Sequence, residues 1–88
     1  MARLDFPIHA EIEGAVEGGA PDAFFELGMM YAAGRDVDAN LVVAHKWFNL
    51  AALKGNKSAL EYRKEIAHEM TKAEIAVAQK LARDYIGK

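Results

Sequence analysis

The sequence predicts an all-α fold, a short α-solenoid in which about five helices form antiparallel hairpins. Apolar residues recur at helical spacing along most of the 88 residues, and no segment alternates in the manner of a β-strand. Alanine, leucine, glutamate and lysine, which are good helix formers, are frequent, and both prolines lie near the N-terminus. Glycine, asparagine and threonine divide the periodic segments at short intervals, which favours antiparallel neighbours.

Two helices are expected in the first part of the chain. A degenerate helix covers about residues 7–19, where a pair of glycines ends it. Pro21 suits the first turn of a second helix, and Asp22 favours its positive N-terminal end. This second helix should end at Gly34, and the polar residues 35–40 form the loop that follows.

Asparagine side chains mark the beginning of the next two helices. A third helix is expected from about Asn40 to Lys54, with Gly55 as a left-handed C-terminal cap. Asn56 can cap a fourth helix, which runs to about Met70.

The fifth helix begins with a capping box. In the segment TKAE, Thr71 can accept from the amide of Glu74, whose side chain can reach back to the amide of Thr71. The helix then runs to about Tyr85.

The third helix is apolar on most of its faces. Trp47 and Phe48 share one stripe with several alanines, and Leu50 and Leu53 occupy much of the other side. Because such a helix is usually sandwiched between others, we predict that it forms the buried spine of the domain.

An internal repeat supports a solenoid. With a shift of 36 residues, AVEGGAPDAFFE lies over AALKGNKSALEY, which aligns glycine with glycine and alanine with alanine. We interpret residues 1–88 as one domain with one intact repeat at about 21–56. The helix at 7–19 and a helix pair at 56–86 are degenerate repeats, as expected for units that cap a stack.

The stretch DAFFELGMMYAAGRDVDANLVVAHKWFNLAALKGNKSA, residues 22–59, resembles a Sel-1-like repeat, a relative of the tetratricopeptide repeat. The family pattern is Ala, Leu-Gly-x-x-Tyr-x-x-Gly, a loop with Gly-Val and Asp, Ala-x-x-Trp and Ala-Ala-x-x-Gly. The matching positions are Ala23, Leu27, Gly28, Tyr31, Gly34, Val37, Ala44, Trp47, Ala51, Ala52 and Gly55.

Two positions depart from the family pattern. Asn40 replaces the preferred aspartate but keeps an oxygen that can cap a helix. Asp36 replaces a glycine, and it strains the loop if that position needs a positive φ.

The resemblance implies a scaffold or adaptor that binds a protein or peptide partner and is not an enzyme. We expect the partner on the second and fourth helices, at Phe25, Met29, Tyr62 and Arg63. The alternative for Phe25 and Met29 is packing against the first helix. The alternative for Arg63 is a capping role, with its stem on apolar surface and its charge reaching water or a carboxylate.

Composition and motifs exclude several other functions. There are no cysteines, the net charge of −2 argues against nucleic-acid binding, and no apolar run is long enough for a membrane span. His9, His45 and His68 lie on separate helices, where surface or partly packed positions are expected, and HEMTK lacks the second histidine of a zinc motif. We therefore expect no catalytic residues, cofactor or metal, and a cytoplasmic location.

Two alternative functions remain open at the level of sequence. One is a small-ligand or enzymatic module with a deep pocket between hairpins, and the other is a self-assembling structural subunit. Since repeat arrays usually need about three units to bury a continuous core, a homo-oligomer is also possible.

Overall fold

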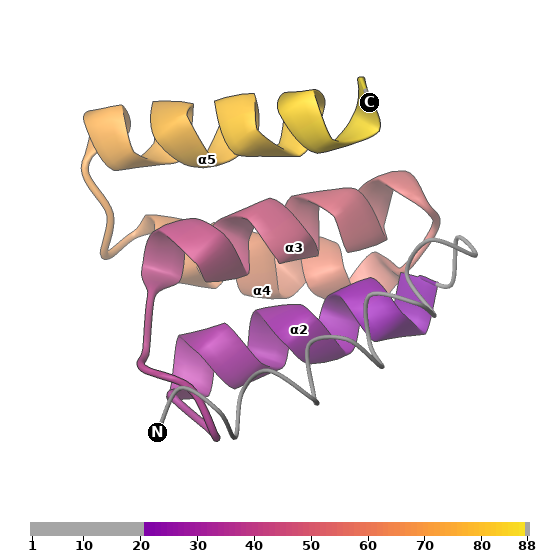
Figure 1. Cartoon of the computed structure of the whole chain (residues 1–88), viewed down its shortest axis with the longest axis horizontal. Coiled ribbons are helices and arrows are strands. Elements are labelled where there is room, and N and C mark those ends of the chain that lie inside the picture. Colours follow the sequence, from indigo (N-terminus) through magenta and orange to yellow (C-terminus); the bar gives the residue numbers. More distant parts are fainter. Residues whose placement is uncertain (1–20, 88) are drawn as a thin grey trace.

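The computed structural model describes residues 21–87, and this part of the chain is all-helical, as predicted. Figure 1 shows its helices and the way in which the chain turns back at each connection. The helices are α2 (Pro21–Ala33), α3 (Leu41–Leu53), α4 (Lys57–Ala67) and α5 (Lys72–Ile86). The helix expected at 7–19 lies outside the described residues.

The predicted caps begin three of these helices. The side-chain oxygen of Asn40 accepts from the amide of Val43 at 3.1 Å, and that of Asn56 accepts from the amide of Ala59 at 2.9 Å. At the start of α5, both hydrogen bonds of the Thr71 capping box are present. These side chains therefore satisfy amides that have no partner within their own helices.

The end of α4 differs from the prediction. The helix ends at Ala67 rather than near Met70, and residues 68–70 form a turn in which the Met70 amide donates to the Ala67 carbonyl at 3.1 Å. Thr71 is extended, with φ −77° and ψ 162°, because it caps the next helix. The chain must therefore leave the helical conformation before it reaches this residue.

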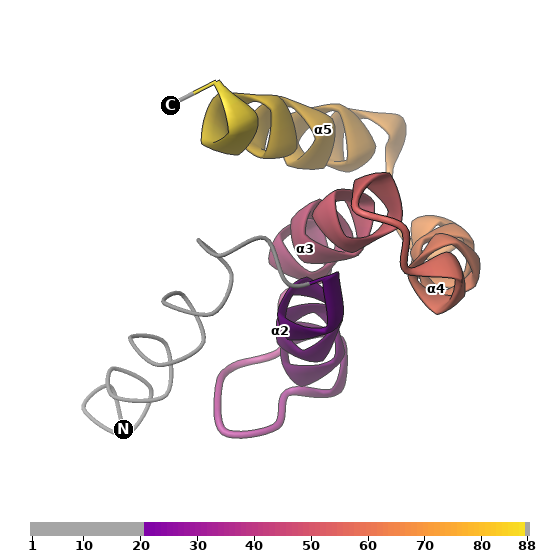
Figure 2. The ribbon, with the colours of Figure 1, turned by 90° about the vertical axis from the view of Figure 1, so that its right-hand side faces the viewer.

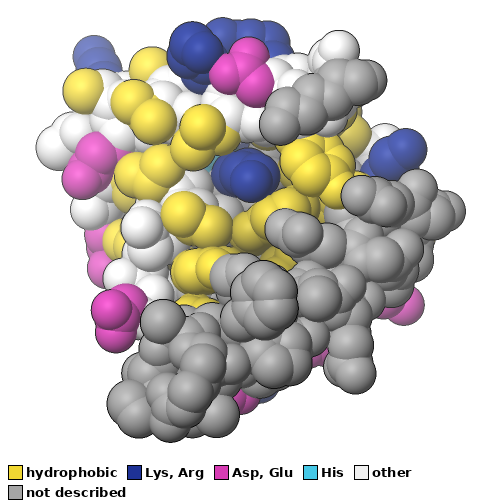
Figure 3. All heavy atoms as spheres, viewed as in Figure 1, with side chains coloured by type: hydrophobic (Ala, Val, Ile, Leu, Met, Phe, Trp, Pro, Cys, Tyr) yellow, Lys and Arg dark blue, Asp and Glu magenta, His cyan; other side chains and the backbone are white. Residues whose placement is uncertain are grey.

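Helix α3 lies at the centre of the described part of the chain. It packs against α2, α4 and α5, and Figure 2 shows it between α2 and α5 with α4 at its side. Its buried residues are Ala44, His45, Trp47, Phe48, Leu50 and Ala51. Figure 3 shows other hydrophobic side chains between α5 and α2. This arrangement confirms the prediction that the apolar third helix is the buried spine of the described part of the chain.

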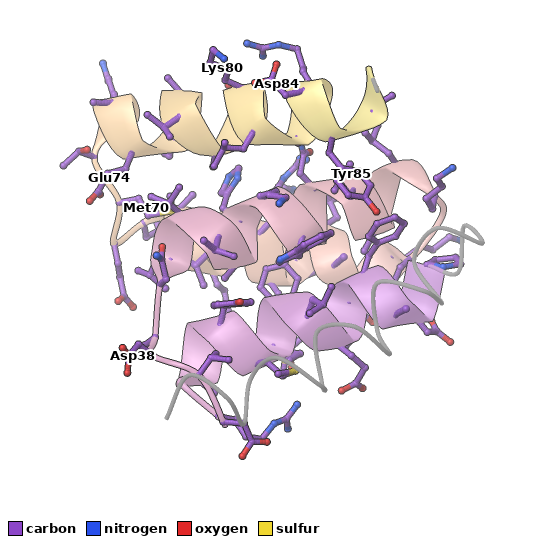
Figure 4. All side chains as sticks on the ribbon, viewed as in Figure 1. Asp38, Met70, Glu74, Lys80, Asp84 and Tyr85 are labelled. Carbon is purple, nitrogen blue, oxygen red and sulfur yellow. The ribbon has the colours of Figure 1, made fainter. Side chains whose placement is uncertain are left out.

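Aromatic rings connect α3 to both of the helices that flank it in Figure 1. Phe24 of α2 stacks on Trp47, with ring centroids 5.9 Å apart. Tyr85 of α5 meets Trp47 edge-on, with ring centroids 5.4 Å apart, and Figure 4 shows its side chain pointing from α5 toward α3.

On the outer face of α5, Lys80 and Asp84 form an ion pair at 2.8 Å. Within residues 21–87, no helix is long and apolar enough to cross a membrane.

Gly28 allows α2 and α3 to approach each other closely. A Cβ atom at this position would lie 2.5 Å from two carbons of the Phe48 ring, and Phe48 is fully buried. Because the core is densely packed, the ring has little room to move away. Any side chain at position 28 would therefore push the two helices apart.

We predict that Gly28→Ala lowers the free energy of unfolding by about 1–2 kcal/mol, since overpacking outweighs the higher helix propensity of alanine. Urea denaturation followed by circular dichroism measures this change. In a Phe48→Leu background the same substitution should be less harmful. An unchanged or raised stability of Gly28→Ala would show that the contact does not limit packing.

The loop between α2 and α3 contains two residues with positive φ. Gly34 has φ 71° and Asp36 has φ 68°. The loop is closed by a hydrogen bond from the Asn40 amide to the Tyr31 carbonyl at 2.9 Å. A left-handed conformation is unfavourable for residues other than glycine, although aspartate tolerates it better than most. The strain expected at Asp36 is therefore present.

We predict that Asp36→Gly raises the free energy of unfolding by up to about 1 kcal/mol, because glycine adopts positive φ without a steric penalty. Asp38→Gly is the matched control: Asp38 does not have positive φ, so the added backbone freedom should leave stability unchanged or lower it. Thermal unfolding of the two variants tests the difference. If both variants respond alike, backbone strain at Asp36 is not the cause.

Candidate partner-binding site

Phe25 and Tyr62, which were predicted to bind a partner, are brought together by the fold. Phe25 extends from α2 and Tyr62 from α4, and their ring centroids lie 5.5 Å apart. Both rings rest on Phe48 of α3, at 5.7 Å each. Phe25 is half-buried, whereas Tyr62 is 38% exposed. The pair, which we call the Phe25–Tyr62 surface, thus has core contacts on one side and solvent on the other.

Met29 lies one turn after Phe25 on α2 and is half-buried against the hydrophobic core. The alternative expectation for these two residues was packing against the first helix, which lies outside the described residues. The ring contacts that the structure describes for Phe25 are to Phe48 and Tyr62, in α3 and α4. These contacts cover part of the Phe25 ring, and packing of Phe25 and Met29 against the first helix stays a prediction.

Arg63 adjoins Tyr62 but reaches back across the helix interface. Its Nη1 donates to Oδ1 of Asn49 on α3, and its side chain is half-buried. In the alternative capping role, the charge of Arg63 was expected to reach water or a carboxylate. The partner that the structure describes is instead the side-chain amide oxygen of Asn49. Within residues 21–87, the guanidinium forms no ion pair.

His45 differs from the expectation that each histidine lies at the surface or is only partly packed. It is only 3% exposed, and its Nδ1 has no hydrogen-bond partner. Burial, followed by the positive charge of Arg63, lowers the pKa of His45 from its ordinary value of 6.5. The sequence feature that could have predicted the burial of His45 is its position on the most apolar helix. By contrast, His68 is exposed as expected, and His9 lies outside the described residues.

Helix α4 is poorly covered by the other described helices. Only Ala59 is buried, and two of its large apolar side chains, Leu60 and Tyr62, are exposed. A soluble helix normally turns such side chains toward a core. The outer part of α4 therefore offers apolar surface for a further contact.

An open hollow of about 370 Å³ lies where α3 turns into α4, and we call it the α3–α4 groove. Its residues are Ala52, Leu53, Gly55, Asn56, Lys57, Leu60 and Arg63. Leu53 is 65% exposed although it belongs to the apolar third helix. Leu53 and Lys57 were not predicted as site residues, because the way in which they meet depends on the angle between α3 and α4. The one sequence feature that indicated the position of this groove was the predicted turn at Gly55 and Asn56.

Among the described residues, no group of histidines, cysteines or carboxylates is arranged to hold a metal ion. Compared with known proteins, this chain matches no family model, no curated protein and no solved structure.

We predict that the protein loses thermal stability as the pH falls below about 6.5, with His45 as one cause. A pKa below the ordinary value means that the unfolded chain binds a proton that the native protein does not bind. The contribution of neutral His45 is therefore complete above pH 6.5, and it is lost as the pH falls through 6.5 toward the native pKa. The melting temperature, measured between pH 8 and pH 5, should fall by several degrees.

The matched variants for this experiment are His45→Gln and His68→Gln. Glutamine does not titrate, so His45→Gln should flatten the part of the profile near pH 6. His68→Gln, at an exposed position, should keep the wild-type slope. An equal slope in all three proteins would contradict the assignment to His45.

Proposed function

We propose that this chain is a Sel-1-like, tetratricopeptide-like repeat domain that binds a partner protein as an adaptor or scaffold. In this proposal α2 with α3 forms the intact repeat, and α4 with α5 forms a degenerate one. The two units form a short solenoid in which α3 packs against both α4 and α5. The domain acts by holding a helix or an extended peptide, without catalysis.

The glycines of the repeat motif support the assignment, because each has a separate structural reason. Gly28 lies against the Phe48 ring, where a side chain does not fit. Gly34 and Gly55 have φ values of 71° and 105°, which other residues rarely adopt. Each of the three glycines therefore lies where a side chain would be unfavourable, as the family pattern requires.

The observation that carries the functional proposal is the exposed apolar surface of α4 beside α2. Tyr62 is 38% exposed while its ring rests on Phe25 and Phe48. An aromatic side chain held rigidly by the core loses little entropy when a partner covers it. Tyrosine is also among the residues that contribute most to binding energy at protein interfaces. The Phe25–Tyr62 surface is therefore suited to an apolar helix or strand of a partner.

We predict that a tagged form of the protein retains a partner in stoichiometric amount from a lysate of its native host, and that Tyr62→Ser releases this partner. Leu81→Ser is the matched control, because Leu81 is also 38% exposed but lies on α5. Affinity capture with mass spectrometry identifies the partner, and titration of the two purified proteins then measures its affinity. Removal of a central aromatic residue should weaken binding by about thirtyfold.

Two results would contradict this proposal. One is the absence of any protein that wild type retains and Tyr62→Ser does not. The other is a concentration-dependent self-association that Tyr62→Ser abolishes, which sedimentation velocity detects. That second result would support the self-assembling subunit instead.

A further inference from the structure

The α3–α4 groove is distinct from the Phe25–Tyr62 surface. It contains Ala52 and Leu53 from the end of α3 and Leu60 from α4. Leu53 and Leu60 are exposed, so the groove holds two large apolar side chains that are left in contact with water. Its volume of about 370 Å³ lies near the lower end of the range for ligand sites. A groove of this size fits one or two side chains of a peptide better than a whole helix.

The charged residues that line the groove are both cations. Lys57 and Arg63 line it, and none of its lining residues is acidic. Within residues 21–87, neither of these two cations forms an ion pair. The carboxylate of Asp22 lies near the groove, where it accepts a hydrogen bond from the Asn56 side chain at 3.2 Å. It forms no ion pair with Lys57 or Arg63. The groove thus presents two cations that lack a carboxylate partner.

Arg63 is the better placed of the two cations for binding an anion. One of its terminal nitrogens donates to Asn49, which fixes the side chain across the interface between α3 and α4. A guanidinium has five N–H donors, so several remain available after this bond. Because Arg63 is also half-buried, a carboxylate beside it would be less screened by water than at an exposed lysine.

We propose that the α3–α4 groove binds an acidic peptide segment of a partner protein, in which a large apolar side chain adjoins a carboxylate. The apolar side chain covers Leu53 and Leu60, and the carboxylate meets Arg63 and Lys57. This inference rests on the proposed function as a protein-binding module, and it adds a second contact surface and the chemistry of its ligand.

The experiment uses a random peptide library displayed on phage and selected on the whole purified chain. We expect the selected peptides to share a leucine, isoleucine or phenylalanine next to aspartate or glutamate. One synthetic consensus peptide is then titrated into the variants by fluorescence anisotropy. Arg63→Gln should weaken binding by about tenfold, and Lys57→Gln by about threefold because Lys57 is exposed. A rise from about 0.05 M to about 0.5 M NaCl should weaken it further.

Matched variants separate binding from folding. Lys64→Gln removes an exposed cation of α4 that does not line the groove, and it should leave the affinity unchanged. Leu53→Ser alters an exposed side chain and should weaken binding without lowering the melting temperature. Arg63→Gln could unfold the protein, because it removes the hydrogen bond to Asn49. In that case the affinities of Lys57→Gln, Leu53→Ser and Lys64→Gln still test the inference.

Several results would overturn the inference. Selected peptides without acidic residues, or equal affinities for Lys57→Gln, Leu53→Ser and wild type, would do so. If Tyr62→Ser abolishes peptide binding and the groove variants do not, the inference fails while the proposed function stands. If no peptide is selected, the groove does not bind such a segment, and affinity capture still tests the proposed function separately. Dimerisation that Leu53→Ser abolishes would identify a second copy of the chain as the occupant.

Discussion

The contact between Gly28 and the Phe48 ring sets the distance between α2 and α3, and the other packing follows from it. Since no side chain separates the two helices at this point, the Phe48 ring can be fully buried. The same close approach lets Phe24 stack on Trp47 further along the interface. Tyr85 of α5 then meets Trp47 from another helix, so rings on three helices share one core.

The candidate binding surface is a continuation of this core rather than a separate feature. Phe48 contacts both Phe25 and Tyr62, and the latter ring extends to solvent. A residue that supports the fold therefore also orients the side chains offered to a partner. This coupling makes the surface rigid, and a rigid surface loses less conformational entropy on binding than a mobile one.

The interface between α3 and α4 combines polar contacts with the apolar contact between Phe48 and Tyr62. On α3, the buried His45 leaves Nδ1 without a partner, and Asn49 accepts a hydrogen bond from Arg63 of α4. Polar groups at an interface are desolvated at a cost that hydrogen bonds only partly offset. The apolar and cationic side chains of α4 remain accessible around the α3–α4 groove.

Much of the local structure was determined by the sequence itself, because helix caps and periodicity depend on residues a few positions apart. The caps at Asn40, Asn56 and Thr71 and the left-handed Gly55 were predicted in this way and are present. Only the tertiary structure decided which side chains meet across helices. The ring pair of Phe25 and Tyr62, the burial of His45 and the groove at Leu53 all depend on the angles at which α2 and α4 cross α3. Those angles follow from the packing of side chains that lie far apart along the chain, and helical periodicity carries no information about them.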